Sequence, residues 1–199
     1  MKEQPQGDVL FMRKSLGVQP RIYPEPVFII AAYDEAGTPQ CMNAAWGGIC
    51  ASNQIMLSLN PAHKTVEALR SAGYFTVSMG QADQVVSCDY VGITSGNNVA
   101  DKFARAGFHA TTSALTGAPI IDELAYTLDC ELVSYDEDSH ILIGEIIDIS
   151  VDESVLTEDG NIDVAALAPI SFDPNTKKYY KLGEAVADAR SVGKQLQGE

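Results

Sequence analysis

Short segments with strand character recur along this chain, and their close spacing constrains the fold more than any other feature. Residues 27–33, VFIIAAY, form a continuous apolar run rich in β-branched side chains, which is typical of a buried strand. In residues 53–60 and 125–135, apolar side chains occupy every second position, the period of a strand with one buried face. Residues 140–151 are apolar on both faces and are expected to form a central strand. Further strands are predicted at residues 9–12, 40–46, 74–79 and 108–112.

Helices are predicted to be few and short. A helix over residues 66–72 is expected to begin at a Thr65 cap and to end at Gly73, and residues 81–93 and 99–106 favour two more. The order of elements is not the strict strand and helix alternation of a parallel sheet, and neither a GxGxxG nor a Walker fingerprint is present. The sequence therefore predicts a mainly β fold, a β-barrel with peripheral helices, rather than a Rossmann fold.

The charge balance argues against two classes of partner. The 199-residue chain has a formal net charge of −14, whereas nucleic acid and anionic membranes require a basic face. We therefore expect neither a nucleic-acid partner nor a membrane partner. An anionic cofactor would have to be held by local donors, which gives weight to Lys64 and Lys102. With 46% hydrophobic and 20% charged residues, the chain can bury the core of one domain.

The cysteines and the first residues bear on the compartment. The four cysteines show neither a CxxC pair nor zinc-type spacing, so no metal site is predicted. They are interpreted as small buried residues of a protein in a reducing cytoplasm, Cys41, Cys50, Cys88 and Cys130. The segment MKEQPQGD has no apolar region of the signal-peptide kind, and no run approaches the length of a membrane span. A cytoplasmic protein is expected.

Residues 40–72 combine features that suit a nucleotide cofactor. The stretch contains the only tryptophan, Trp46, in a predicted loop of small residues at the end of the strand 40–46. An alternating strand follows, and then His63, Lys64 and Thr65 at the start of a helix. An aromatic side chain beside tightly turning backbone can lie against a flat ring. Amide groups, a hydroxyl and a lysine at a helix N-terminus can hold a phosphate. On residue type alone, Trp46 could equally be a core aromatic and the helix start could be merely solvated.

Several motifs resemble, in their order and spacing, those of one family. N-A-A-W-G-G and N-P-A-H-K-T are similar to the FMN-binding core of the flavin reductase-like, or flavoredoxin, proteins. Y-P-E-P-V precedes them, and C-D-Y-V-G-I-T-S-G-N-N-V-A-D-K-F, S-H-I-L-I-G-E-I and P-I-S-F follow. The resemblance covers residues 21–183, between a lead-in at 1–20 and a polar tail at 184–199. It implies the FMN-binding split β-barrel, an antiparallel Greek-key barrel, and a homodimer with each FMN at the subunit interface.

The resemblance also implies which residues hold FMN. Trp46 would lie beside the isoalloxazine ring, and Asn43, where relatives often carry threonine, would hydrogen-bond the flavin edge or the ribityl chain. Residues 60–65 would bind the phosphate and the ribityl chain, with His63 and Lys64 where many relatives carry arginine and an aromatic residue. The implied set is Asn43, Ala44, Ala45, Trp46, Asn60, His63, Lys64, Thr65, Ser95, Lys102, His140 and Phe172.

The later members of this set have plain alternatives. Lys102 would by default be a surface lysine on a helix, but the matching lysine of the family approaches the flavin, where a cation favours the anionic reduced ring. His140 could be a structural histidine, and Phe172 a core aromatic. The resemblance places His140 near the cofactor, from the same or the partner subunit, and Phe172 near the ring face. Ser95 is expected to shape the loop before Lys102 through its backbone.

The resemblance implies a function and leaves its details open. We expect an FMN-binding oxidoreductase in which the flavin N5 accepts a hydride from NAD(P)H, or electrons from another donor. The acceptor would be a small molecule, such as free flavin, a ferric chelate or a disulfide, or a protein. No side chain is expected to act as a nucleophile, and FMN would be either tightly held or released after reduction. The alternative is a flavoredoxin-type electron carrier, or a flavin-binding module, without its own NAD(P)H turnover.

Overall fold

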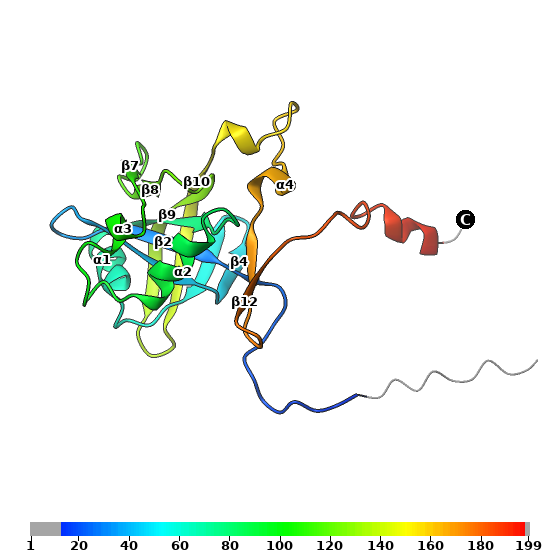
Figure 1. The fold of residues 1–199 in the computed structure, drawn as a ribbon, viewed down its shortest axis with the longest axis horizontal. Coiled ribbons are helices and arrows are strands. Elements are labelled where there is room, and N and C mark those ends of the chain that lie inside the picture. The colour runs from blue at the N-terminus through cyan, green and yellow to red at the C-terminus, as the bar shows by residue number, and fades with distance from the viewer. Residues whose placement is uncertain (1–12, 198–199) are drawn as a thin grey trace, which may run out of the picture.

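A curled antiparallel sheet forms the body of the protein in the computed structural model, which describes residues 13–197 (Figure 1). Its strands lie in the order β3-β2-β6-β9-β10-β5-β4. Their bounds are Phe28–Tyr33 (β2), Pro39–Ala44 (β3), Gly47–Ala51 (β4), Gln54–Ser58 (β5), Tyr74–Met79 (β6), Tyr126–Asp136 (β9) and Ile141–Val151 (β10). The mainly β architecture is confirmed. The strand predicted at residues 9–12 lies outside the described residues.

Two smaller antiparallel sheets accompany the large one. They consist of β1 (Glu25–Pro26), β11 (Ile170–Asp173) and β12 (Lys178–Lys181) in one sheet, and β7 (Ala110–Thr112) and β8 (Pro119–Ile121) in the other. The β11–β12 hairpin is tied to the first described segment. Tyr23 donates from its hydroxyl to Asp173 at 2.6 Å, and Arg21 donates to the Asn175 side chain at 2.8 Å.

Three helices pack on the large sheet, α1 (Lys64–Ala72), α2 (Val85–Ile93) and α3 (Lys102–Arg105). They explain why β2 is a continuous apolar run. Phe28, Ile30 and Ala32 belong to the core that fills the curl of the sheet and includes the buried face of α1. Ile29 and Ala31 belong to a second core, which includes buried residues of α2 and α3. Because both faces of β2 are buried, its apolar side chains occupy consecutive positions and not every second one.

The start of α1 differs from the prediction. Its N-cap residue is His63, and no side chain forms the capping hydrogen bond. Thr65 lies inside the first turn and is only 1% exposed, so the predicted Thr65 cap is wrong. Burial of this side chain, rather than capping, decides its position. The predicted end is confirmed, since Gly73 has φ of 75° and donates to the Leu69 carbonyl.

The small residues that follow Trp46 form a strand rather than the predicted loop. The strand predicted at residues 40–46 ends before Trp46, and β4 begins at Gly47 and pairs with β5. A Cβ at Gly47 would lie 2.6 Å from both the Met56 carbonyl oxygen and the Leu57 side chain. The glycine therefore serves close strand packing, a need that the local sequence pattern does not reveal.

Several other boundaries also shift. β10 lies inside the sheet, as expected, but Ile147 and Ile149 in its second half are exposed. The helix predicted at 81–93 begins only at Val85, and the one at 99–106 contracts to α3. Two short helices were not predicted, η1 (Glu153–Val155) and α4 (Val164–Leu167). Across residues 13–197, no helix has the length and apolarity needed to span a membrane.

The cysteines are free, and the expectation that they are buried holds for all but one. Cys41, Cys88 and Cys130 are buried, which raises the pKa of Cys41 and Cys130 to about 12. Cys50 is exposed on β4. The prediction is wrong there because β4 is an edge strand whose outer positions face solvent.

The chain after β12 leaves the body of the molecule. Residues 182–197 are exposed throughout and include only one short helix, η2 (Val192–Leu196), as Figure 1 shows in red.

Candidate functional site

Three adjoining pockets open around Asn43, near the end of β3. The helix pocket, of about 330 Å³, is bounded by the start of α1 and by the segment from the end of α2 to Lys102. The tryptophan pocket, of about 340 Å³, lies beside Trp46 and His140. The hairpin pocket, of about 450 Å³, is bounded by α2 and the β11–β12 hairpin. Asn43 lines all three.

Every residue that the sequence implied for the site lines at least one pocket. The helix pocket includes Asn43, Asn60, His63, Lys64, Thr65, Ser95 and Lys102. The tryptophan pocket includes Asn43, Ala44, Ala45, Trp46, Asn60, His63 and His140. The hairpin pocket includes Phe172 with Asn43, Ala44 and Ala45. Segments far apart in the sequence thus converge here, whereas the role of each side chain toward a ligand stays a prediction.

Asn43 is held at this junction by α2. Its side-chain amide donates to the Cys88 carbonyl at 3.0 Å. A Cβ at Gly92 would lie 3.0 Å from the Asn43 Cβ, so the glycine allows α2 to pack closely against this residue. Since the amide nitrogen is engaged by α2, the Asn43 Oδ1 is the atom that can accept a hydrogen bond from a ligand.

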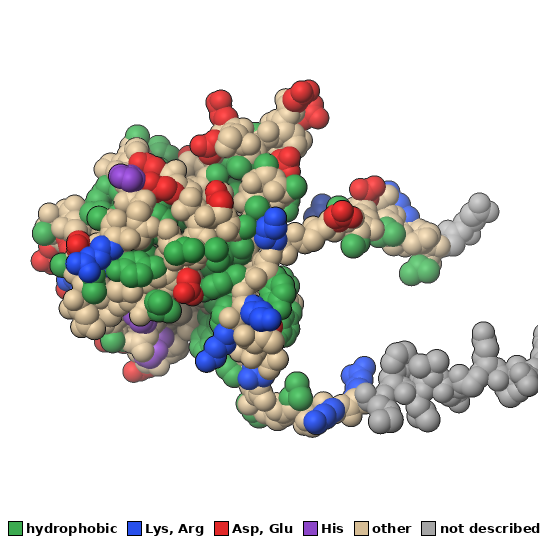
Figure 2. Space-filling model, in the orientation of Figure 1, with side chains coloured by type: hydrophobic (Ala, Val, Ile, Leu, Met, Phe, Trp, Pro, Cys, Tyr) green, Lys and Arg blue, Asp and Glu red, His purple; other side chains and the backbone are tan. Residues whose placement is uncertain are grey.

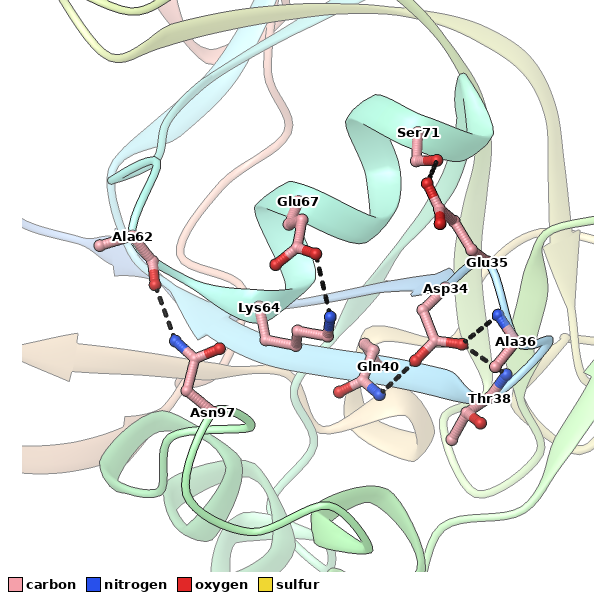
Figure 3. A network of polar contacts seen from close by, with 10 residues as sticks. All are labelled: Asp34, Glu35, Ala36, Thr38, Gln40, Ala62, Lys64, Glu67, Ser71 and Asn97. Carbon is pink, nitrogen blue, oxygen red and sulfur yellow. Dashed lines mark hydrogen bonds and ion pairs between the residues drawn. The ribbon is translucent and has the colours of Figure 1, made fainter.

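The loop before α1 is held from two sides. The Asn60 Oδ1 accepts from the Ala62 amide at 2.9 Å. From the other side, Asn97 donates from its side chain to the Ala62 carbonyl at 3.0 Å (Figure 3). These bonds fix the position of the helix start at the wall of the helix pocket. Because α1 has nine residues and no side-chain cap, its partial positive end is available to an anion.

Lys64 is engaged along α1 in this structure. Its ammonium pairs with the Glu67 carboxylate at 3.0 Å, as Figure 3 shows. Exposed pairs of this kind contribute only about 0–1 kcal/mol, so Lys64 can leave Glu67 for a phosphate at little cost. A Cβ at Gly96 would lie 3.2 Å from the Lys64 Cβ, so this glycine lets the Ser95 loop approach α1.

Lys102 is a buried lysine, 4% exposed, and not the surface lysine that its helical position alone suggests. Its ammonium donates to the Val91 carbonyl at 3.3 Å and to the Thr94 carbonyl at 3.1 Å. A cation is favourable at this place because it meets the partial negative end of α2. Burial lowers the pKa of Lys102. Partial burial, and then the charge of Lys102, lower the pKa of His63.

The tryptophan pocket exposes its aromatic wall. Trp46 is 54% exposed, so it is not a core aromatic. His140 lies in the turn before β10 with φ of 61°, and its carbonyl accepts from the Leu59 amide at 2.9 Å. That backbone bond places the histidine beside the end of β5 and on the same pocket as Trp46, within one chain.

The hairpin pocket contains residues that the sequence reasoning did not single out. Tyr179 donates from its hydroxyl to the Asp89 carboxylate at 2.8 Å, and the rings of Tyr179 and Phe172 lie 5.7 Å apart. Burial first, and then the Asp89 hydrogen bond, raise the pKa of Tyr179. Asp89 belongs to the C-D-Y motif, which was the only available signal. Its contact with Tyr179 spans 90 positions and has no local signature.

The fold and the pockets define a mainly β barrel with a hollow that combines aromatic surfaces and cationic donors. A family model described as flavin reductase like domain matches residues 20–175, and the chain belongs to this family. The family resemblance inferred from the sequence motifs is confirmed.

Two solved flavoredoxin structures are similar to the chain over nearly its whole length. One is the flavoredoxin of Desulfovibrio vulgaris (Miyazaki F), with a TM-score of 0.87 and 38% identity, covering 92% of this chain and 100% of that one. Another is a flavoredoxin from Methanosarcina acetivorans, with a TM-score of 0.81 and 26% identity, covering 93% and 98%. These matches confirm the split-barrel fold.

One curated relative matches over a shorter stretch. An uncharacterized protein of Aquifex aeolicus (strain VF5) is 32% identical over 72 residues, which are 35% of this chain. The chain spans only 37% of the length of that relative. The match therefore adds nothing on activity.

Proposed function

We propose that this protein is an FMN-binding oxidoreductase that moves a hydride or electrons from NAD(P)H through FMN to an acceptor. The observation that carries the proposal is the convergence of Asn43, Trp46, Thr65 and Lys102 on adjoining pockets in a chain of the flavin reductase like family. Within residues 13–197, no group of three or more His, Cys, Asp or Glu residues is arranged to hold a metal ion.

The residues present fit FMN at both ends of the molecule. For the phosphate, the helix pocket offers the uncapped start of α1, the Thr65 hydroxyl and the nearby Lys64. For the flat ring, the tryptophan pocket offers the exposed face of Trp46. The combination of an anion site and an aromatic surface in adjoining pockets favours FMN over a simple anion.

FMN, when bound, supplies the redox chemistry by accepting a hydride at N5. Lys102 uses two of its ammonium hydrogens on carbonyl groups, which leaves a third to donate to the ligand. A positive charge held there stabilises negative charge that develops on an adjacent ring. Asn43 would accept from the ring edge or the ribityl chain, and Thr65 would donate to the phosphate.

A homodimer belongs to the same proposal. The sheet opens into an apolar groove of about 690 Å³ whose lining includes Phe28, Met79 and Ile149, and Ile49 at its rim is exposed. An apolar groove with exposed isoleucine side chains along it is a feature of protein–protein interfaces. Light scattering after gel filtration should give twice the 21.3 kDa chain mass, and Ile49→Asp should shift it toward one chain. If the wild-type protein had the mass of a single chain, the proposed homodimer would be contradicted.

Other details of the proposal follow the resemblance. The barrel domain would span residues 21–183, between the segment 1–20 and the tail 184–199, and the protein would be cytoplasmic. The second candidate function, an electron carrier without its own NAD(P)H turnover, is favoured by the similarity to two flavoredoxins. Its acceptor or donor would then be a protein.

The deciding experiment is an anaerobic titration of the purified protein, with its visible spectrum recorded. We expect flavin absorption bands that bleach with NADH or NADPH. Bands that resist both nucleotides but bleach with dithionite would support the carrier. A colourless protein that fails to bind added FMN would remove both functions. Dependence of NAD(P)H oxidation on added free flavin would show that FMN is released as a substrate.

A further inference from the structure

The hairpin pocket is the part of the hollow that the FMN proposal uses least. Asp89, Lys177 and Tyr179 line it and have no role in holding FMN in that proposal. Its volume of about 450 Å³ is in the range of small-molecule sites. It shares Ala44 and Ala45 with the tryptophan pocket, so a molecule bound in it would lie beside the proposed position of the flavin ring.

One wall of this pocket is aromatic and fixed. Phe172 and Tyr179 are opposite one another in the β11–β12 register, and their ring centroids are 5.7 Å apart. The Tyr179 hydroxyl is tied to Asp89 on α2 at 2.8 Å, which holds the tyrosine ring against the opposite wall. Because the raised pKa keeps this hydroxyl neutral, Tyr179 presents an uncharged surface suited to a flat ring.

The lysine at the rim sits on a rigid turn. Lys177 has φ of 54°, and its amide donates to the Asp173 carbonyl at 2.8 Å. The Asp173 carboxylate accepts from the Asn175 amide at 2.8 Å and from the Tyr23 hydroxyl at 2.6 Å. The turn is therefore fixed by bonds within the hairpin and to the segment before β1, which holds the backbone of Lys177 beside the pocket while the residue stays exposed.

The charge of the hairpin sets it apart from the rest of the protein. Between residues 22 and 176, every lysine and arginine is engaged: Lys64, Arg70 and Arg105 in ion pairs and Lys102 with two carbonyl groups. Within residues 13–197, none of the ion pairs involves the hairpin lysines, Lys177, Lys178 and Lys181. Figure 2 shows lysine and arginine side chains gathered over this hairpin. In a chain of net charge −14, a free cation beside a pocket indicates an anionic ligand.

We propose that the hairpin pocket binds the second redox substrate, a molecule that joins a flat ring to a negatively charged group, and that Lys177 holds the negative group. The inference rests on the proposed function, because it needs FMN in the neighbouring pockets. Two sources share this chemistry: a nicotinamide dinucleotide acting as electron donor, and a second flavin nucleotide acting as electron acceptor. In both, the ring packs against Phe172 and Tyr179 while a phosphate reaches Lys177.

The test is calorimetric titration of the FMN-loaded protein with two probes. Tetrahydro-NAD, which cannot transfer a hydride, represents the donor, and FMN added beyond one equivalent represents the acceptor. We expect one of them to bind. Removing the charge with Lys177→Gln should weaken that binding about threefold, and reversing it with Lys177→Glu about tenfold. The probe that binds shows whether the hairpin pocket takes the electron donor or the electron acceptor.

Lys178→Glu is the matched control, because it makes the same charge change at the neighbouring exposed position, which does not line the pocket. It should weaken the probe less than twofold. Equal weakening by both reversals, no effect of Lys177→Glu, or no binding of either probe would overturn the proposal. Weaker binding of the first equivalent of FMN to Lys177→Glu would also overturn it, because the pocket would then hold the cofactor itself.

The proposed function can fail separately. If the protein binds no FMN at all, the oxidoreductase is lost, and the titration of the flavin-free protein with tetrahydro-NAD decides the pocket. Weakening by Lys177→Glu but not by Lys178→Glu would then support an anion-binding pocket of the same chemistry. If Lys177→Glu left the affinity of the flavin-free protein for tetrahydro-NAD unchanged, the proposal for the hairpin pocket would also be overturned.

Discussion

Lys102 lines the helix pocket and also pairs with carbonyl groups at the end of α2. A buried lysine needs partners for its ammonium, and this one finds them in the carbonyl groups of Val91 and Thr94 at the end of α2. The same bonds hold its charge at the pocket wall. One side chain thus pairs the last carbonyl groups of a helix and holds a positive charge at the wall of a pocket.

Replacing this lysine should affect ligand and helix together. Lys102→Ala removes a cation and leaves two carbonyl groups unpaired, so we expect FMN affinity to fall about tenfold and the protein to lose about 1–3 kcal/mol of stability. Fluorescence titration of FMN and chemical denaturation measure these effects. Arg105→Ala, on the same helix but in an exposed ion pair, should change neither appreciably. Unchanged FMN binding and redox behaviour in Lys102→Ala would contradict its assigned role.

At the scale of elements, β4 and the β11–β12 hairpin decide the shape of the site. β4 is the edge strand beyond β5, and Trp46 directly precedes it. The hairpin brings Phe172 and Tyr179 against α2, at a separation of 90 positions between Tyr179 and its partner Asp89. Neither arrangement is visible in a window of local sequence.

The pairing of β4 with β5 depends on one of two adjacent glycines. A Cβ at Gly47 would overlap the Met56 carbonyl oxygen at 2.6 Å, whereas a Cβ at Gly48 meets nothing within 4 Å. Gly47→Ala should therefore destabilise the protein by about 1–3 kcal/mol, and Gly48→Ala by less than about 0.5 kcal/mol. Urea denaturation compares the two variants. Equal stabilities would show that β4 shifts freely away from β5.

The hairpin turn should respond to acid through Asp173. Hydrogen bonds from Thr176 and Tyr23 lower the pKa of Asp173 to about 2, below its ordinary value of 3.8. The carboxylate therefore stabilises the folded state above about pH 3.8, and this contribution is lost as the pH falls through about 2. Asp173→Asn should lower Tm by about 2 °C or more at pH 7, and the difference from wild type should shrink toward pH 2.

Scanning calorimetry over that pH range tests the expectation. Asp188→Asn, in the exposed tail, is the control and should follow wild type at every pH. A difference between Asp173→Asn and wild type that stays constant from pH 7 to pH 2 would mean that the carboxylate charge does not hold the turn.

At the scale of the whole molecule, the barrel and its pockets form one body, and the tail stands apart. Residues 182–197 are exposed along their length, and the pocket linings contain none of them. Deleting residues 184–199 should leave Tm within about 1 °C and FMN affinity within about twofold. Calorimetry and fluorescence titration measure both. A marked loss of either would show that the tail packs on a second subunit.

The sequence determined the elements whose cause is local. Alternating and continuous apolar runs predicted most strands of the sheet, because the side-chain period of a strand is written in consecutive residues. Motifs in a fixed order then indicated the family and a set of site residues that line common pockets. The predictions of a Thr65 cap and of a loop after Trp46 were wrong for one reason. Packing against distant residues determined the position of Thr65 and the strand conformation of β4.

Only the tertiary structure decided which side chains meet. Asn43 on β3 meets Lys102 because α3 folds beside β3, and the β11–β12 hairpin brings Phe172, Lys177 and Tyr179 to the same hollow. The tertiary structure also decided that Lys102 is buried and that Trp46 is exposed, because burial depends on which other parts of the chain pack around a residue. Contacts across tens of positions follow from strand order and register, which local propensity does not encode.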